Sequence, residues 1–182
     1  LEPIYETLFE GSSYGYRPER SQHQCLEALG RTIQQARVSH VVEADITGFF
    51  NEVNHDWMIK FLQLRIGDPR IIRLIQRMLK GGILEDGLIK ASEKGTPQGS
   101  ILSPLLSNIY LHYALDEWFS KIVQPRCRGE AYFYRFADDF VACFQYREEA
   151  ENYLLGLDQR VRRFGLELAL EKTRCMEFGR FA

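Results

Sequence analysis

Three aspartates carry the most informative chemistry in this sequence. Asp45 closes a mainly apolar run, residues 41–45, and the pair Asp138-Asp139 interrupts an aromatic-rich segment, residues 132–144. Carboxylates at the ends of apolar strands are costly to hold unless a cation neutralises them. The cations that this pattern indicates are two divalent metal ions about 4 Å apart, which catalyse in-line phosphoryl transfer.

A second interpretation of Asp138-Asp139 needs no metal. Aspartate is common in hairpin turns because it tolerates tight turns and hydrogen-bonds to its own backbone. The rings of Phe136 and Phe140 beside the pair favour the metal interpretation, since a solvated turn does not need them. Spacing alone leaves both interpretations open.

Asp45 and Asp138 can meet only through the fold, so the surrounding elements matter. Ser21 and Gln24 form a capping-box pattern, Asn54 or Asp56 can cap a further helix, and Asp68-Pro69 is a helix-start signal. The pattern predicts strands near 41–46, 166–170 and 174–178, and an aromatic-rich hairpin over 132–144 with Asp138-Asp139 at its tip. It also predicts a small hairpin over 83–89, helices starting near 22, 55, 69 and 150, and a buried helix from about 101 to 122.

This order of elements favours an α+β fold. An antiparallel sheet with helices packed on one face would leave the other face free for a ligand. If the first strand pairs beside the aspartate hairpin, the three carboxylates converge at one edge of the sheet.

Composition limits the class of protein. The chain has 182 residues, 45% of them hydrophobic, which suffices for one domain with a core. It has no stretch long enough to span a membrane and no signal peptide, and its four cysteines lack paired spacing. We therefore expect a cytoplasmic protein with reduced thiols, no membrane partner and no histidine or cysteine metal site.

The net charge of −2 is unusual for a protein that binds nucleic acid, since such proteins are commonly basic. The ends of the sequence read as the ends of a fragment. We therefore expect any strongly basic surface to lie in segments outside this chain.

The polar loop over residues 95–100 is a second candidate site. Gly95 and Gly99 allow the backbone to approach a ligand closely, Pro97 fixes a bend, and Gln98 offers a donor and an acceptor. A helix start at Ser100 or soon after it would attract phosphate. An ordinary loop before a capped helix is the alternative, and the loop does not match the phosphate-binding loop that ends in Gly-Lys-Ser/Thr.

Taken together, several motifs are more specific than any one of them. In chain order they are SYGYRPERS (13–21), EADITGFF (43–50), GTPQGS (95–100), LSPLLSNIY (102–110), FADD (136–139), GLEL (165–168) and EKT (171–173). This order resembles the reverse transcriptases encoded by bacterial group II introns. The resemblance extends over essentially the whole chain.

The resemblance implies the palm of a right-hand polymerase with part of the adjoining fingers. It makes residues 1–182 a single reverse transcriptase domain fragment, without the thumb and maturase segments. Residues of about 1–40 and 55–95 would be fingers and palm helices, and residues 41–54 and 96–182 would be palm.

The resemblance also implies the cofactor. Asp45 and Asp138 would hold two Mg²⁺ ions, Asp139 would complete the catalytic trio, and manganese is expected to substitute. The carbonyl of Ile46 is a candidate extra ligand. Lys172 falls where a lysine would protonate the leaving pyrophosphate, although a solvated lysine beside Glu171 would look the same.

Further site residues follow from the same resemblance. The ring of Phe50 would block a ribose 2′-hydroxyl, whereas Phe49 is the candidate core residue. Ala137 would lie under the primer end, beside Phe136, which stands where tyrosine is usual. Gln98 would contact the incoming nucleotide or the template pair. The remaining candidates, expected to contact nucleic acid, are Arg17, Arg20 and Gly99.

The implied reaction copies an RNA template from a DNA primer with deoxynucleoside triphosphates, and the full-length protein would bind intron RNA. Glu19 and Ser100 stand where glycine is usual in the family. An isolated fragment is expected to hold primer–template weakly.

Two alternatives stay open: a splicing maturase that only binds intron RNA, and a nucleotidyl cyclase on a similar palm.

Overall fold

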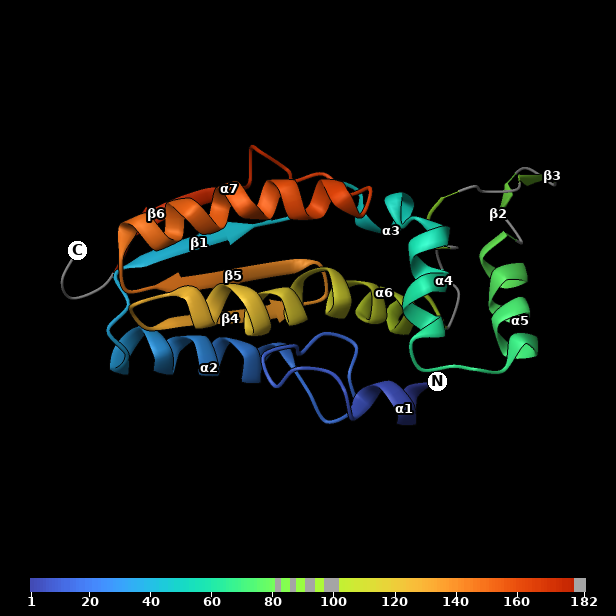
Figure 1. Ribbon diagram of the computed structural model, residues 1–182, viewed down its shortest axis with the longest axis horizontal. Helices are drawn as coiled ribbons and strands as arrows, with labels where there is room; N and C mark the ends of the chain where they lie inside the picture. Colours follow the sequence, from blue (N-terminus) through green and yellow to red (C-terminus); the bar gives the residue numbers. More distant parts are fainter. Residues whose placement is uncertain (81–82, 86–87, 91–93, 97–101, 179–182) are drawn as a thin grey trace.

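The computed structural model describes residues 1–80, 83–85, 88–90, 94–96 and 102–178. Its centre is a four-stranded antiparallel sheet with the strand order β4-β5-β1-β6 (Figure 1). The strands are β1 (His40–Ala44), β4 (Ala131–Phe136), β5 (Asp139–Phe144) and β6 (Arg174–Glu177). β1 thus lies between two strands that come from the second half of the chain.

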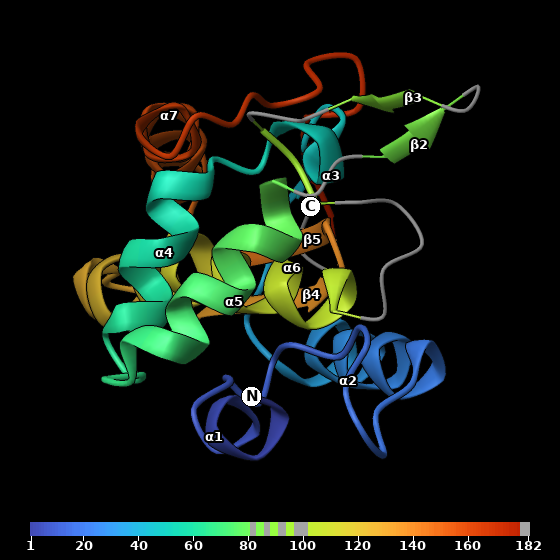
Figure 2. The same ribbon diagram turned by 90° about the vertical axis from the view of Figure 1, so that its right-hand side faces the viewer.

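Helices cover this sheet and extend beyond one end of it (Figures 1 and 2). α7 and the long helix that begins with α6 pack on the sheet, while α4 and α5 lie past its end. The helices and the small hairpin are α1 (Glu2–Glu6), α2 (Gln22–Gln35), α3 (Phe49–Glu52), α4 (His55–Gln63), α5 (Pro69–Lys80), α6 (Ser103–Leu111), α7 (Arg147–Arg163), β2 (Ile83–Glu85) and β3 (Leu88–Lys90).

Local sequence signals account for the helix ends. Ser21 and Gln24 form the expected capping box at the start of α2, and the Asn54 side chain accepts a hydrogen bond from the Trp57 backbone at the start of α4. α7 ends in a Schellman motif, in which Gly165 has a φ of +74°. The starts of α2 and α4 confirm the sequence prediction.

The long helix after α6 is not a regular α-helix throughout. It continues as two π-helical segments, η1 (His112–Asp116) and η2 (Phe119–Val123), and a 3₁₀ turn, η3 (Gln124–Arg126). The guanidinium of Arg160 donates to the carbonyls of Tyr113 and Ala114 at 2.9 and 2.8 Å. α7 thereby satisfies two carbonyl groups of the irregular segment.

Alternation along the strands separates the two faces of the sheet. One face carries Val42, Phe133 and Ala142, which belong to the main core beneath α6 and α7. The other face carries Glu43 and Tyr134. α2 packs on this second face beside β4, where the hydroxyls of Thr32 and Tyr134 are 2.6 Å apart. The part of this face near β1 and β6 stays open.

Two details differ from the sequence prediction. The strand predicted over 166–170 is a single antiparallel bridge between Ile46 and Leu168, because the chain turns again at Leu170 instead of continuing along β1. Helical spacing predicts an apolar face on α2 that includes Leu26, Leu29 and Ile33, but Leu26 is 57% exposed and the other two are only partly buried, since this helix covers only the margin of the sheet.

No helix in the described part of the chain is long and apolar enough to cross a membrane. The four cysteines are all free thiols.

Candidate active site

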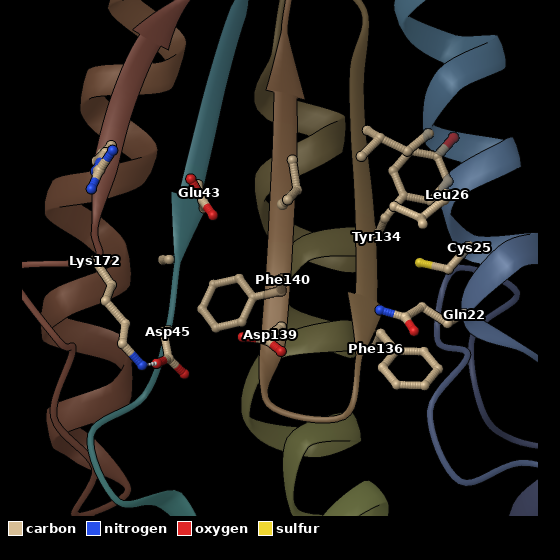
Figure 3. A pocket seen from close by; sticks show the side chains of 14 residues that line it. Gln22, Cys25, Leu26, Glu43, Asp45, Tyr134, Phe136, Asp139, Phe140 and Lys172 are labelled. Atoms are coloured by element: carbon tan, nitrogen blue, oxygen red, sulfur yellow. Dashed lines mark hydrogen bonds and ion pairs between the residues drawn. The ribbon is translucent and has the colours of Figure 1, made fainter.

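The strand register brings the three aspartates together. β1 pairs antiparallel with β5 so that Ala44 lies opposite Phe140. One position further along, Asp45 and Asp139 therefore occupy opposed places at the same end of the sheet (Figure 3). Asp138 lies next to them, in the two-residue turn between β4 and β5.

The electrostatics of the three carboxylates are coupled. Burial raises the pKa of Asp138 above its usual value, and the charge of Asp45 raises it further. Burial likewise raises the pKa of Asp139, with added repulsion from Asp138 and Asp45. The site therefore concentrates negative charge that this chain neutralises incompletely, which is typical of functional sites.

Lys172 is the cation that contacts this cluster. Its ammonium lies 2.6 Å from Oδ2 of Asp45, and this hydrogen bond, with the negative charge of Asp45, raises the pKa of the lysine. The connection is anchored by the backbone, because Ala169 donates to the Asp45 carbonyl at 2.9 Å and Lys172 donates to the Ala169 carbonyl at 3.0 Å. Lys172 and Asp45, both selected from the sequence, are therefore in direct contact in the structure.

The donor set suits magnesium or manganese, because it consists of carboxylate oxygens. Within the described ranges, no three histidine, cysteine, aspartate or glutamate side chains converge closely enough to enclose a metal ion as they stand. Magnesium sites commonly need only one or two protein carboxylates, with substrate phosphates and water completing the shell. Asp45 keeps Oδ1 on the Ile46 backbone N–H at 2.8 Å, so Oδ2 is the atom that an ion would share with Lys172.

The turn that carries Asp138 rests on a buried arginine that the sequence analysis did not select. Arg135 and Asp116 have no exposed side-chain surface and form two hydrogen bonds of 2.7 Å. The same guanidinium donates to the carbonyl of Ala137 at 2.8 Å and to Asn108 Oδ1 at 3.0 Å. Since Ala137 directly precedes Asp138, this arginine fixes the backbone of the turn from below.

The hydrogen bonds of Arg135 and Asn108 extend to the first segment of the chain. Arg135 also donates to Ser13 Oγ at 2.8 Å, and the Asn108 amide donates to the Gly15 carbonyl at 2.7 Å. A β-carbon at Gly15 would lie 2.2 Å from the backbone nitrogen of Ala137. Only glycine therefore fits here, and residues 13–15 form one wall of the turn.

Ala137 has a left-handed backbone, with φ of +57°. Such a conformation at the first residue of a two-residue hairpin turn usually calls for glycine. Ala137 is also 9% exposed, so a larger side chain would meet both backbone strain and close packing.

A cleft of about 430 Å³ opens in front of these residues. Asp45, Glu43 and Lys172 lie on its β1–β6 side, and Asp139 and Phe136 on its β5–β4 side (Figure 3). α2 forms the far wall through Gln22, Cys25, Leu26 and Leu29. The cleft thus combines a carboxylate end with an apolar and aromatic wall.

Phe50 lies near this end of the sheet on the short helix α3. Its ring packs edge-on against Phe49, with centroids 5.5 Å apart, and Phe49 is 1% exposed, as expected of a core residue. Thr96 donates to the Phe50 carbonyl at 2.7 Å, and Gly95 donates to the Val53 carbonyl at 2.8 Å. The base of the glycine-containing loop is therefore attached to α3, whereas the predicted contacts Gln98 and Gly99 lie outside the described residues.

The two predicted arginine contacts differ in their surroundings. The guanidinium of Arg17 is 4% exposed and is engaged by Glu6 and by the carbonyls of Glu10 and Ser13. This geometry gives Arg17 a structural role in the first segment and does not support the predicted contact with nucleic acid. Arg20 donates to the Gly11 carbonyl at 2.7 Å and stacks on Tyr14 at the surface.

The antiparallel sheet, its helices and the carboxylates at the strand ends define the palm of a polymerase. The same fold forms about a third of two solved telomerase chains, although sequence identity is low. Telomerase from Candida tropicalis truncated from its C-terminal domain matches 91% of this chain and 36% of its own, with 14% identity and a TM-score of 0.68. Telomerase from Candida albicans in complex with an RNA fragment matches 91% of this chain and 31% of its own, with 12% identity and a TM-score of 0.70.

The family model described as reverse transcriptase (RNA-dependent DNA polymerase) matches residues 1–179, so the chain belongs to this family. The group II intron-encoded protein LtrA of Lactococcus lactis subsp. cremoris is 46% identical over 112 residues, covering 62% of this chain and 18% of LtrA. Protein YkfC of Escherichia coli is 34% identical over 169 residues, covering 78% of this chain and 44% of YkfC. The chain therefore spans less than half the length of these relatives.

Proposed function

We propose that this chain is the catalytic segment of an RNA-directed DNA polymerase of the group II intron type. The observation that carries the proposal is the convergence of Asp45, Asp138 and Asp139 at one end of the sheet, in a chain of the reverse transcriptase family. The division into palm, about 41–54 and 96–182, and fingers and palm helices, about 1–40 and 55–95, belongs to this proposal.

The reaction is the attack of a primer 3′-hydroxyl on the α-phosphate of a deoxynucleoside triphosphate. The bond between the α- and β-phosphates breaks, and pyrophosphate leaves. Two Mg²⁺ ions, or Mn²⁺, held by the three aspartates with the Ile46 carbonyl, would activate the hydroxyl and stabilise the leaving group. Positioning and charge stabilisation are the contribution of the protein.

Lys172 is the proton donor in this proposal. Its contact with Asp45 raises the pKa of the ammonium, which keeps the group protonated at neutral pH. The proton would pass from Nζ to an oxygen of the departing pyrophosphate. A lysine held at Asp45 is well placed for this, since the substrate phosphates gather at the same carboxylates.

Phe50, Ala137 and Phe136 shape the nucleotide site. The buried ring of Phe49 supports Phe50 from below, so a ribose 2′-hydroxyl would meet a ring with little freedom to move aside. Ala137 would lie under the primer end, beside Phe136. Gln98 and Gly99 would contact the incoming nucleotide and the template, and Arg20 the nucleic-acid backbone.

The partners in this proposal are an RNA template, a DNA primer and deoxynucleoside triphosphates. Intron RNA is an additional partner of the full-length protein. The free thiols agree with a cytoplasmic location, which we also propose.

The test is extension of a DNA primer annealed to an RNA template, at graded magnesium and manganese, by a full-length protein that contains this chain. Wild-type protein should extend the primer, and Asp138→Asn should reduce extension by several orders of magnitude while the fold persists. Phe50→Ala should retain extension but accept ribonucleotides more readily. Normal extension by the Asp138→Asn protein would overturn the proposal.

A further inference from the structure

α5 carries an unusual concentration of positive charge. Residues 69–80 contain four cations and no carboxylate, whereas the whole chain has a net charge of −2, so the other residues together carry −6. Several other helical segments instead pair their cations with carboxylates of the same segment. The relevant pairs spaced by four residues are Arg31–Glu27, Lys121–Glu117, Arg147–Glu151 and Arg162–Asp158.

The four cations of α5 form one stripe. Arg70, Arg73, Arg77 and Lys80 follow each other at intervals of three or four residues, which places them on the same side of the helix. The rise of 1.5 Å per residue makes this stripe about 15 Å long. Ile72, Ile75 and Leu79 bury the opposite side against the core.

The surface lies away from the carboxylate cleft. α4 separates α5 from the sheet, and α5 lies with β2 and β3 at one end of the molecule (Figures 1 and 2). All four cationic residues are exposed. The stripe is therefore a positive surface separate from the acidic cleft and does not form a wall of it.

These charges do not stabilise the helix itself. Like charges three or four residues apart repel each other, and Arg70 lies in the first turn, where the helix dipole disfavours a cation. Arg70 is partly compensated by Asp68 at 3.1 Å, and Arg73 donates to the Pro69 carbonyl. In the described part of the chain, no carboxylate forms an ion pair with Arg73, Arg77 or Lys80.

We propose that this stripe binds the phosphate backbone of double-helical RNA outside the catalytic cleft. The choice of a nucleic acid rests on the proposed function, which supplies RNA as the polyanion. Three of the four cations are arginines, which engage phosphates through two parallel hydrogen bonds. α5 contains no aromatic residue on which single-stranded bases could stack, so the contact fits a duplex backbone and is independent of sequence.

The test compares two triple variants of the 182-residue chain. Arg73→Gln/Arg77→Gln/Lys80→Gln removes the stripe, and Arg128→Gln/Arg147→Gln/Arg162→Gln removes the same charge from exposed paired arginines elsewhere. Glutamine keeps the helix propensity close to that of arginine and lysine. Circular dichroism and thermal melting should show equal folding of both variants.

Binding to a fluorescent RNA hairpin without primer is measured by anisotropy in EDTA, over a series of salt concentrations. We expect the α5 variant to bind at least tenfold more weakly and its logarithmic salt slope to fall by roughly 2 to 3, since each lost phosphate contact contributes about 0.9. The control variant should lose less than threefold. Wild-type protein should bind the hairpin more tightly than a single strand of the same length.

Equal losses in the two variants would assign the effect to net charge and overturn the proposal. So would undiminished binding by the α5 variant, or equal affinity for the single strand. Unlabelled polyglutamate that displaces the fluorescent hairpin as strongly as unlabelled hairpin does would also overturn the proposal. The stripe, with the neighbouring exposed residues Ile71, Leu74 and Met78, would then fit an acidic polypeptide partner.

This experiment is independent of the proposed catalysis. Asp138→Asn should abolish primer extension by the full-length protein and leave hairpin binding unchanged. The two proposals can therefore fail separately. If the wild-type full-length protein extends no primer but the α5 variant still loses hairpin binding, the stripe is supported and the proposed function is not.

Discussion

Arg135 and Asp116 form a fully buried ion pair through two hydrogen bonds of 2.7 Å, directly beneath the turn that carries Asp138. The carbonyl of Ala137 accepts a further hydrogen bond from the same guanidinium. The ion pair therefore links the long helix after α6 to the backbone turn that carries the Asp138 carboxylate.

Removal of one partner of this pair should be strongly destabilising. Arg135→Met leaves the Asp116 carboxylate buried without its cation, which costs about 3–5 kcal/mol in comparable buried pairs. The double change Arg135→Met/Asp116→Leu removes the unpaired charge and should recover part of this loss. Urea denaturation measures the free energy of unfolding of each protein.

The double variant also separates stability from positioning. Even where stability recovers, primer extension should stay low, because nothing then holds the Ala137 carbonyl. The exposed pair Arg147–Glu151 supplies the control, and Arg147→Gln should leave the free energy of unfolding close to that of the wild type. Full extension by the double variant would show that the pair has no positioning role.

The second prediction concerns the contact between Gly15 and Ala137. A methyl group at Gly15 would lie 2.2 Å from the Ala137 nitrogen, so either the turn or the first segment must move. Gly15→Ala should cost roughly 1–3 kcal/mol, as overpacking commonly does, and should reduce extension.

Gly11→Ala is the matched control for this substitution, because a β-carbon at Gly11 meets no atom within 4 Å. Its free energy of unfolding and its extension rate should stay close to those of the wild type. Chemical denaturation and primer extension measure both variants, and equal behaviour of the two proteins would contradict the close approach at Gly15.

The third prediction concerns pH and the charge of Asp138. Its pKa in the folded protein is raised above the ordinary value of 3.8 by burial and by Asp45, so the folded state holds this proton more tightly than the unfolded chain does. The protonated form of Asp138 therefore contributes to the free energy of unfolding at low pH. This contribution is lost as the pH rises from about 3.8 through the pKa that Asp138 has in the folded protein. Above that window the ionised carboxylate opposes folding.

Asp138→Asn should consequently raise the thermal midpoint of the metal-free protein at pH 7, while it abolishes extension. The gain should shrink at low pH, where Asp138 itself becomes protonated. Thermal melts in EDTA between pH 3 and pH 8 measure this dependence. A lower midpoint for Asp138→Asn at pH 7 would mean that the carboxylate stabilises the turn more than burial and repulsion oppose it.

Periodicity and caps predicted most of the fold, because each signal acts within a few residues. Asn54 and Gly165 mark their helix boundaries through contacts with their immediate neighbours. The strand expected over 166–170 shortened to one bridge at Leu168, since pairing with β1 depends on how far the chain follows its partner. That distance is a property of the tertiary structure.

The site divided in the same way. The motifs located Asp45, Asp138 and Lys172, which the structure places together. Arg135 was not selected, although strand alternation places it on the same face as Phe133 and thus in the core, where a charge requires a partner. Its partner Asp116 could not be identified from the sequence. Asp116 lies in η1, an irregular π-helical segment of the long helix, where regular helical spacing does not predict which side a residue occupies.

The last prediction concerns competition between Lys172 and a metal ion for Asp45. The ammonium lies 2.6 Å from Oδ2 of Asp45, with 64% of the lysine side chain exposed. An exposed ion pair contributes only a small free energy, and an ion that uses Oδ2 must offset part of this contact. Lys172→Gln should therefore bind Mn²⁺ up to roughly fivefold more tightly, as an energy of that size permits.

The same substitution should slow primer extension if Lys172 donates the proton, so that metal affinity and rate change in opposite directions. Electron paramagnetic resonance of free Mn²⁺ measures the affinity, and single-turnover extension measures the rate. Lys172→Arg retains the charge and should keep the wild-type affinity. If Lys172→Gln binds Mn²⁺ less tightly, the lysine supports the metal site by orienting Asp45 and does not compete for it.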